Sequence, residues 1–176
     1  MNNYNFVACT YEHHAQAILD IFNEAIIHTT ALFDYKPRTM ETMQGWFDAK
    51  RVGNFPVIGI EDRDGTLLAF GTFGAFRPHS AYKYTVEHSV YVHKDHRGKG
   101  LGKQIIQELI KVAEEHGVHA MIAGIEALNQ KSIALHEKFG FKHVGDLPQV
   151  GFKFGQWLDL AFYELILETP KNPIDG

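Results

Sequence analysis

The sequence predicts a single α/β domain built on a mixed β-sheet, and three observations lead to this fold class. The chain has 176 residues, and one domain usually takes about 100–200. Hydrophobic residues make up 45% and charged residues 22%, as in soluble globular proteins. The middle of the chain alternates between strand and helix periodicity, which indicates a mixed sheet. Since no linker or internal repeat interrupts the pattern, one domain is expected over residues 1–176, with residues 170–176 frayed.

Two helices are expected before the first strand. Thr10 is a candidate N-cap, and apolar residues recur at helical spacing after it through His28. A polar break at residues 34–38 separates this helix from a second one, expected from Thr39 to about Lys50. The second helix carries a stripe of methionine and aromatic residues, which predicts that this side packs into a core.

Three strands are expected in the next segment, where the hydrophobic period becomes alternating. Val57–Ile60 and Thr66–Phe76 are expected to form a hairpin around the charged turn at Asp64-Gly65. Thr85–Val92 alternates along its whole length. Its first face carries Val86, His88, Val90 and Val92, and its second face carries Thr85, Glu87, Ser89 and Tyr91.

The second half of the chain is expected to alternate helix and strand. A helix is expected from about Leu101 to His116, and a buried strand over Ala120–Ala127. Asn129 is a candidate cap for a helix that ends at Gly140, where glycine suits the left-handed C-terminal position. Gly151–Leu167 is expected to form strands.

Composition excludes several classes of function. The net charge is −4 at pH 7, whereas a general nucleic-acid binder is normally basic, so no nucleic-acid partner is expected. A single cysteine, Cys9, excludes a disulfide framework and a multi-cysteine metal cluster. His88, His93 and His96 are close in sequence, but no acidic or cysteine residue completes a tetrahedral set, and no metal is expected.

The sequence also lacks membrane and export features. The first residues have neither the basic nor the apolar region of a signal peptide, and no apolar run is long enough to span a bilayer. We therefore expect a soluble, cytoplasmic protein with no membrane partner.

A glycine-rich turn between a predicted strand and a predicted helix is the strongest candidate for a ligand site. It contains Arg97, Gly98, Lys99, Gly100, Leu101, Gly102 and Lys103. Glycines permit a positive φ, so several backbone N–H groups can converge on one anion. The following helix N-terminus and the three cations add positive charge. The turn therefore predicts a phosphate site, most simply for a pyrophosphate.

Two nucleotide motifs do not fit this turn. A P-loop needs a glycine where Arg97 stands and a serine or threonine where Gln104 stands. The dinucleotide pattern G-x-G-x-x-G fails because Lys103 occupies the third glycine position. A tight strand–helix turn with solvated lysines is the alternative without a ligand.

The pattern that fits is Arg-x-x-Gly-x-Gly, formed by Arg97, Gly100 and Gly102. With it, the chain resembles the GCN5-related N-acetyltransferases (GNAT). Residues 129–141 (NQKSIALHEKFGF) resemble the second motif of that family, an Asn-capped helix ending in Gly-Phe. Thr85–Val92 and Gly151–Asp159 are similar to the phosphinothricin and methionine sulfoximine acetyltransferase subgroup. The resemblance runs from about Phe6 to Leu167.

The resemblance implies a mostly antiparallel mixed sheet with a splayed central strand pair, a homodimer, and acetyl-CoA as the co-substrate, without a metal. Its pyrophosphate would bind the glycine-rich turn, and its pantetheine arm would pair with the backbone around Val90, Tyr91 and Val92 as an added strand. Asn129 and Ser132 are further expected cofactor contacts.

Acetyl transfer to an amine requires a proton acceptor near the acetyl group. Glu87 lies in an apolar stretch of its strand, where a carboxylate is costly without a task, and the resemblance gives it the role of the base. A solvent-facing strand carboxylate is the alternative. His136 replaces a tyrosine that many family members carry, and it either protonates the coenzyme A thiolate or only bonds the cofactor.

The resemblance also points to a small amine acceptor such as phosphinothricin, methionine sulfoximine or methionine sulfone. Arg77 is expected to bind its carboxylate, with Lys83 in the same loop, and Phe33 to line its side chain. An exposed loop cation and a core aromatic are the alternatives for Arg77 and Phe33. Acetylation of a polyamine, an aminoglycoside or a protein N-terminus remains a second enzyme hypothesis, and a non-catalytic coenzyme A sensor is a third.

Overall fold

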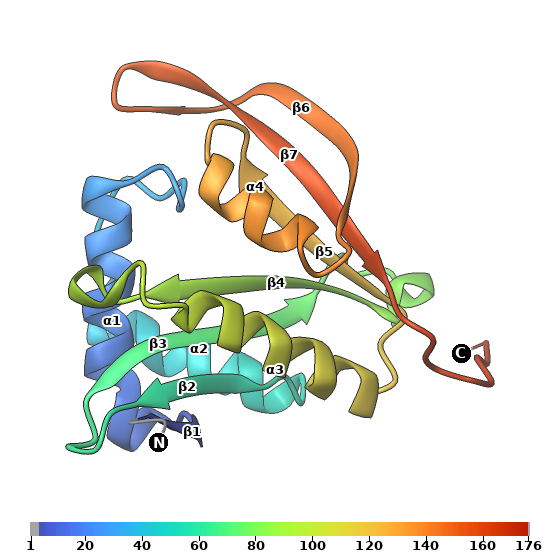
Figure 1. Cartoon of the computed structure of the whole chain (residues 1–176), viewed down its shortest axis with the longest axis horizontal. Coiled ribbons are helices and arrows are strands. Elements are labelled where there is room, and N and C mark those ends of the chain that lie inside the picture. Colours follow the sequence, from blue (N-terminus) through green and yellow to red (C-terminus); the bar gives the residue numbers. More distant parts are fainter. Residues whose placement is uncertain (1–3, 176) are drawn as a thin grey trace.

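The computed structural model describes residues 4–175, which form one seven-stranded mixed sheet with helices on both faces (Figure 1). The strand order is β1-β2-β3-β4-β5-β7-β6. The elements are β1 (Asn5–Ala8), α1 (Tyr11–His28), α2 (Met40–Val52), β2 (Val57–Glu61), β3 (Leu67–Ala75), β4 (Thr85–Val92), α3 (Leu101–Glu115), β5 (Ala120–Glu126), α4 (Gln130–Glu137), β6 (Lys142–Lys153) and β7 (Gln156–Ile166). The expectations for residues 1–3 and 176 lie outside the described residues.

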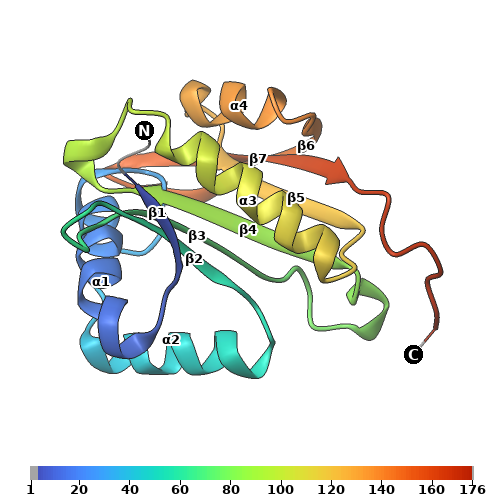
Figure 2. The same cartoon turned by 60° about the horizontal axis from the view of Figure 1, so that its bottom comes forward.

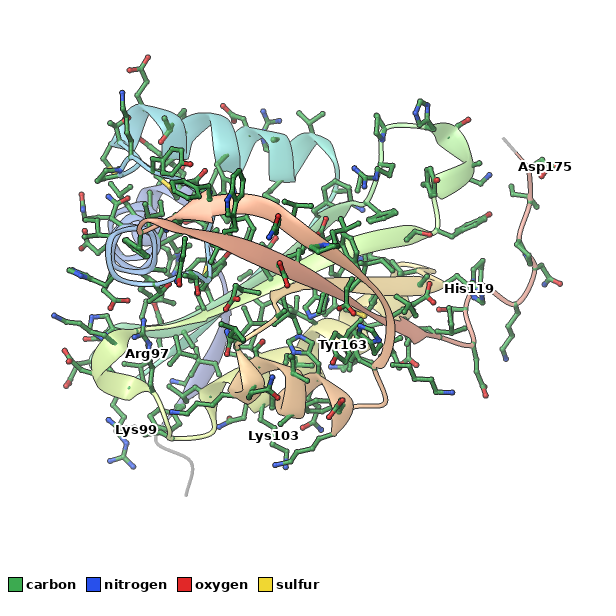
Figure 3. All side chains as sticks on the ribbon, turned by 90° about the horizontal axis from the view of Figure 1, so that it is seen from above. Arg97, Lys99, Lys103, His119, Tyr163 and Asp175 are labelled. Atoms are coloured by element: carbon green, nitrogen blue, oxygen red, sulfur yellow. The ribbon has the colours of Figure 1, made fainter. Side chains whose placement is uncertain are left out.

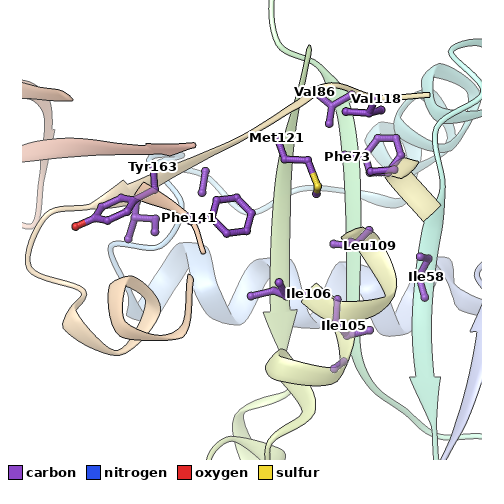
Figure 4. Packing of buried hydrophobic residues seen from close by; sticks show 14 of the residues in the cluster. Ile58, Phe73, Val86, Ile105, Ile106, Leu109, Val118, Met121, Phe141 and Tyr163 are labelled. Atoms are coloured by element: carbon purple, nitrogen blue, oxygen red, sulfur yellow. The ribbon is translucent and has the colours of Figure 1, made fainter. Parts of the chain in front are cut away.

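The helices divide the core into two layers (Figure 2). α1 and α2 bury one cluster of apolar side chains on one side of the sheet, around Phe22 and Phe70. α3 buries Ile105, Ile106 and Leu109 on the other side, against β-strand residues such as Met121 (Figure 4). Each fully buried side chain of this size contributes roughly 1.5–3 kcal/mol of transfer free energy, so the two layers fix the sheet between the helices.

The parallel pair β4–β5 is the irregular feature of the sheet. The other pairs are antiparallel, whereas β4 and β5 run in the same direction. Their register holds only from Thr85 opposite Ala120 to Glu87 opposite Ile122. Beyond that point β4 stays paired with β3 and β5 stays paired with β7. The two strands therefore diverge, which confirms the expected splayed central pair.

Most expected elements are confirmed, and the errors lie at the two edges of the sheet. β4 has the expected bounds, and α1, α2 and α3 agree within two residues at either end. The sequence does not predict β1, and β6 begins at Lys142 rather than Gly151. β6 contains Gly145 and Pro148, and its register with β7 shifts before Gly145 and before Gly151. These bulges hide the strand period.

In residues 167–175, which the structure describes, no helix or strand follows β7. The Tyr84 hydroxyl accepts a hydrogen bond from Ile174 N at 3.1 Å and donates one to Ile174 O at 3.3 Å. These two hydrogen bonds hold the described part of the tail beside the start of β4. None of the helices within residues 4–175 has the length and apolar character needed to cross a membrane.

A buried lysine joins the β6–β7 hairpin to the end of α1. Lys153 is 4% exposed, and its ammonium donates to the carbonyls of Ile26 at 2.7 Å, Thr29 at 2.9 Å and Leu32 at 2.6 Å. The last carbonyls of a helix have no partner inside the helix. Lys153 therefore completes the C-terminus of α1 and fixes the loop that follows it.

We predict that Lys153→Met destabilises the protein by about 2–3 kcal/mol, because bonds to a charged donor are lost and buried carbonyls remain without partners. Urea unfolding followed by circular dichroism measures this change. Lys142→Met, at the exposed start of the same strand, is the matched control and should change stability by less than about 0.5 kcal/mol. Equal effects of the two substitutions would contradict the anchoring role.

Candidate active site

The divergence of β4 and β5 opens a cavity of about 430 Å³. Its two walls are residues 88–92 of β4 and residues 123–126 of β5. On β4, the backbone groups that face away from β3 have no strand partner after Glu87. Backbone N–H and C=O groups require partners, so this edge can accept an extended ligand as an additional strand.

The glycine-rich turn lies at one end of this cavity. Gly98 and Gly100 have φ angles of 78° and 79°, a conformation that suits glycine. Gly100 is the N-cap of α3, and no side chain caps the helix, so its first N–H groups are free for an anion. Arg97, Lys99 and Lys103 extend along this side of the molecule (Figure 3). The Arg97 guanidinium also forms an ion pair with Glu24 of α1.

A second helix N-terminus faces the same cavity. The Asn129 side chain caps α4 by accepting from Ser132 N at 3.2 Å, and both residues line the cavity with Lys131. Two helix dipoles thus add positive potential to one space, which favours an anionic ligand.

The structure brings most of the expected cofactor residues together. Those that line the 430 Å³ cavity are Val90, Tyr91, Val92, Arg97, Gly102, Asn129, Ser132 and His136. Gly98, Lys99, Gly100 and Lys103 lie beside it as exposed residues of the turn and first helical turn. Leu101 is 1% exposed in the core, so only its backbone is available to a ligand.

A second cavity of about 360 Å³ adjoins the first one. Both cavities are lined by Ala31, His88, Ser89, Tyr91, Gly124 and Glu126. Glu87 lines the second cavity, and its Oε1 lies 3.0 Å from the position that a Cβ on Gly124 would take. Partial burial raises the pKa of the Glu87 carboxyl, and the Arg77 guanidinium opposes this shift. A carboxyl with a raised pKa is suited to accept a proton near neutral pH.

Glu126 borders both cavities and is not among the residues that the sequence singles out. It is 8% exposed, and its carboxylate accepts from Leu128 N at 3.1 Å and from the Thr30 hydroxyl at 3.3 Å. A carboxylate at the end of an apolar strand is the signal that could have identified it. Glu126 thereby places a second negative charge where the cavities meet.

His88 and His136 form a buried pair at the fork of the two strands. His88 Nδ1 lies 3.0 Å from Ile122 O, the two Nε2 atoms are 2.9 Å apart, and His136 Nδ1 lies 2.7 Å from Ser132 O. Carbonyl oxygens only accept, so both Nδ1 atoms must donate, and the N–N contact needs one further proton. Three protons on two rings make a cation, because two neutral rings carry only two.

Burial opposes that third proton. It lowers the pKa of His88 to about 3, with His136 adding to the shift, and it also lowers the pKa of His136. At neutral pH the pair is therefore neutral, and one of the three hydrogen bonds is unmade. A neutral imidazole beside the larger cavity can accept a proton and pass it on.

The expected acceptor residues occupy different places. Phe33 lines the second cavity, and its ring packs against Gly151 so closely that a Cβ there would lie 2.7 Å from it. Arg77 is exposed above the ring of Phe76 at 4.9 Å, outside the cavity lining. Lys83 is exposed and lies over Tyr84 at 5.1 Å. Lys50, expected from the sequence only as the end of a helix, does line this cavity.

Within residues 4–175, no group of three or more His, Cys, Asp or Glu side chains is arranged to hold a metal ion.

Comparison with known proteins identifies related chains. The sequence model of the Acetyltransferase (GNAT) family matches residues 16–141. The L-methionine sulfoximine/L-methionine sulfone acetyltransferase of Pseudomonas paraeruginosa is 44% identical over 155 residues, covering 88% of this chain and 90% of that protein. An N-acetyltransferase structure from Staphylococcus aureus Mu50 is 48% identical with a TM-score of 0.90, covering 94% of this chain and 99% of that one. A GNAT superfamily phosphinothricin acetyltransferase from Sinorhizobium meliloti, in complex with acetyl-CoA, is 29% identical with a TM-score of 0.92, covering 98% and 93%.

Proposed function

The chain belongs to the GNAT acetyltransferase family, and we propose that it transfers acetyl from acetyl-CoA to the free amine of a small amino acid or analogue. Methionine sulfone, methionine sulfoximine and phosphinothricin are the acceptor types. The activity is that of an N-acetyltransferase with acetyl-CoA as co-substrate. The observation that carries the proposal is the meeting of two cavities at the strand fork, one with two helix N-termini and the other with Glu87.

In this proposal acetyl-CoA occupies the larger cavity. Its pyrophosphate binds the free N–H groups at Gly98–Lys103 and the cations of that turn. Its pantetheine arm pairs with the open backbone edge at Val90, Tyr91 and Val92. Asn129 and Ser132 line the same cavity at the N-terminus of α4. The thioester then lies toward the fork, where the two cavities join.

The acceptor occupies the smaller cavity with its amine toward Glu87. A free α-ammonium has a pKa of about 7.7–8.0, so it must lose a proton before attack. Glu87 accepts that proton, and the amine attacks the thioester carbonyl directly. When the carbon–sulfur bond breaks, the electron pair goes to sulfur. The attacking nitrogen still carries one excess proton, and the neutral His136 ring accepts that proton and gives it to the thiolate.

The remaining acceptor contacts follow from the cavity walls. Phe33 packs against the acceptor side chain from the cavity wall, while Arg77 and Lys83, which lie outside the lining, supply positive charge from the loop before β4. A polyamine, aminoglycoside or protein N-terminus is the alternative acceptor class, and a coenzyme A sensor without turnover is the alternative function. Thiol release from acetyl-CoA, measured across amino acids, polyamines and peptides, separates these cases.

The larger cavity generates a prediction for acetyl-CoA binding. A Cβ on Gly102 would meet Leu135, Val92 and Val90 at 3.5–4.0 Å, so the backbone tolerates a side chain that points into the cavity. Gly102→Val should weaken acetyl-CoA binding about 10- to 100-fold, as expected for an overpacked site. Calorimetry measures the affinity. Gly45→Val, in a helix with nothing within 4 Å of its Cβ, is the control and should bind normally.

The base proposal predicts the effect of Glu87→Gln, which keeps the shape of the side chain and removes its basicity. General base catalysis contributes about 10²–10⁴-fold, so kcat should fall by that factor while acetyl-CoA affinity stays the same. The wild-type rate should fall in acid as Glu87 is protonated, above the pH typical of an ordinary glutamate because its pKa is raised. Near wild-type kcat for the variant at neutral pH would exclude Glu87 as the base.

We also propose a cytoplasmic homodimer that joins through the β6–β7 hairpin. Of the aromatic residues in β7, Tyr163 is 6% exposed in the core, whereas Trp157 is 61% exposed and packs edge to face against exposed Phe152. Trp157→Glu should shift a dimer to a monomer in sedimentation at micromolar concentration. Val52→Glu, at an exposed position of α2, should leave the dimer intact. A monomeric wild type would refute this assembly.

A further inference from the structure

Lys50 is a half-buried cation that lines the acceptor cavity and forms no ion pair with the other residues that the structure describes. Its ammonium donates to Phe73 O at 2.9 Å and lies 5.5 Å from the ring centre of Trp46 and 5.8 Å from that of Phe55. Among residues 4–175 no carboxylate oxygen lies within 4.0 Å of it. Burial lowers its pKa to about 8. A buried charge without a counter-ion is costly, and an anionic ligand removes that cost.

The ammonium lies next to Glu87 on the same face of the sheet. Gly74 is directly opposite Glu87 in the β3–β4 register, and Lys50 Nζ lies 3.3 Å from where a Cβ on Gly74 would be. Opposite residues of antiparallel strands have Cβ atoms about 5 Å apart. The Glu87 carboxyl leans the other way, over Gly124 of β5. The Lys50 ammonium therefore lies over Gly74 of β3, and the Glu87 carboxyl lies over Gly124 of β5. Neither glycine has a side chain, so both positions leave room for these groups.

We infer that Lys50 binds the carboxylate of an α-amino-acid acceptor while Glu87 faces its amine. This inference rests on the proposed function and extends it to a requirement for a free carboxylate beside the reacting amine. An α-amino acid carries both groups on one carbon, so it fits between a cation and a carboxylate on one face of the sheet. Arg77 lies outside the cavity lining and is the outer of the two cations. Lys50 is thus a specificity-determining residue.

The charge of Lys50 gives the site a pH dependence. The groups that share its cavity are Glu87 and His88 of β4, Tyr91 of β4 and Glu126 of β5. Lys50 is charged below its pKa of about 8 and neutral above it. KM for an amino acid should therefore rise above pH 8, although deprotonation of the amine raises the rate there. An acceptor without a carboxylate should show no such rise in KM.

The test compares methionine sulfone with the amine that lacks only its carboxylate. For wild type and Lys50→Met, kcat/KM is measured with both acceptors. The ratio of kcat/KM for methionine sulfone to kcat/KM for the amine should fall about 10- to 100-fold in Lys50→Met, mainly through a higher KM for methionine sulfone. This is the effect expected for loss of a charged hydrogen bond. Lys50→Arg should restore most of the ratio. Lys111→Met, at an exposed position of α3, is the matched control and should leave the ratio unchanged.

Several outcomes would overturn the assignment, and calorimetry separates them from failure of the proposed function. An unchanged ratio in Lys50→Met, or an equal loss with both acceptors, would make Lys50 a structural residue. A wild type that binds methionine sulfone no more tightly than the amine would exclude a carboxylate site. A wild type that acetylates neither compound would instead refute the proposed acceptor, whatever the binding preference.

Discussion

The site depends on one constraint of the sheet, which is that β4 and β5 pair only as far as Glu87 and Ile122. Two neighbouring parallel strands would normally satisfy each other's backbone groups along their length. At the last pair the His88 side chain replaces the backbone donor that β4 would otherwise provide, because its Nδ1 donates to Ile122 O. Beyond that ring the edges separate, and the space between them joins both cavities. A conventional β4–β5 pair would close this space.

The rest of the fold holds one wall of the smaller cavity in place. Residues 31–33, which line it, follow α1 and form no regular element of their own. Lys153 bonds three carbonyls of this region, and the Tyr35 hydroxyl donates to Phe152 O at 2.5 Å. The β6–β7 hairpin is therefore part of the site although none of its exposed aromatics lines a cavity. The buried Lys153 ammonium therefore stabilises both the fold and the wall of the smaller cavity.

The sequence predicts local features well and distant contacts poorly. β4 and the helices are predicted because periodicity is a property of neighbouring residues, and the turn at Arg97–Lys103 is predicted because its glycines act locally. β1 and the start of β6 are missed because short or bulged edge strands show little alternation. Lys50 and Glu126 are missed for another reason. Each becomes part of the site only when α2, β3 and β5 come together, and a helix-end lysine has no local sign of burial.

The charges of the two cavities are arranged for opposite tasks, and the histidine pair lies between them. The larger cavity has helix N-termini and cations, which suit the phosphates and the developing thiolate of coenzyme A. The smaller one has Glu87, Glu126 and Lys50, which suit a zwitterion. One reaction removes protons from an amine and supplies one to a sulfur atom. Since His88 lines both spaces and His136 only the larger, the histidine pair connects the space that holds Glu87 with the space that holds the two helix N-termini.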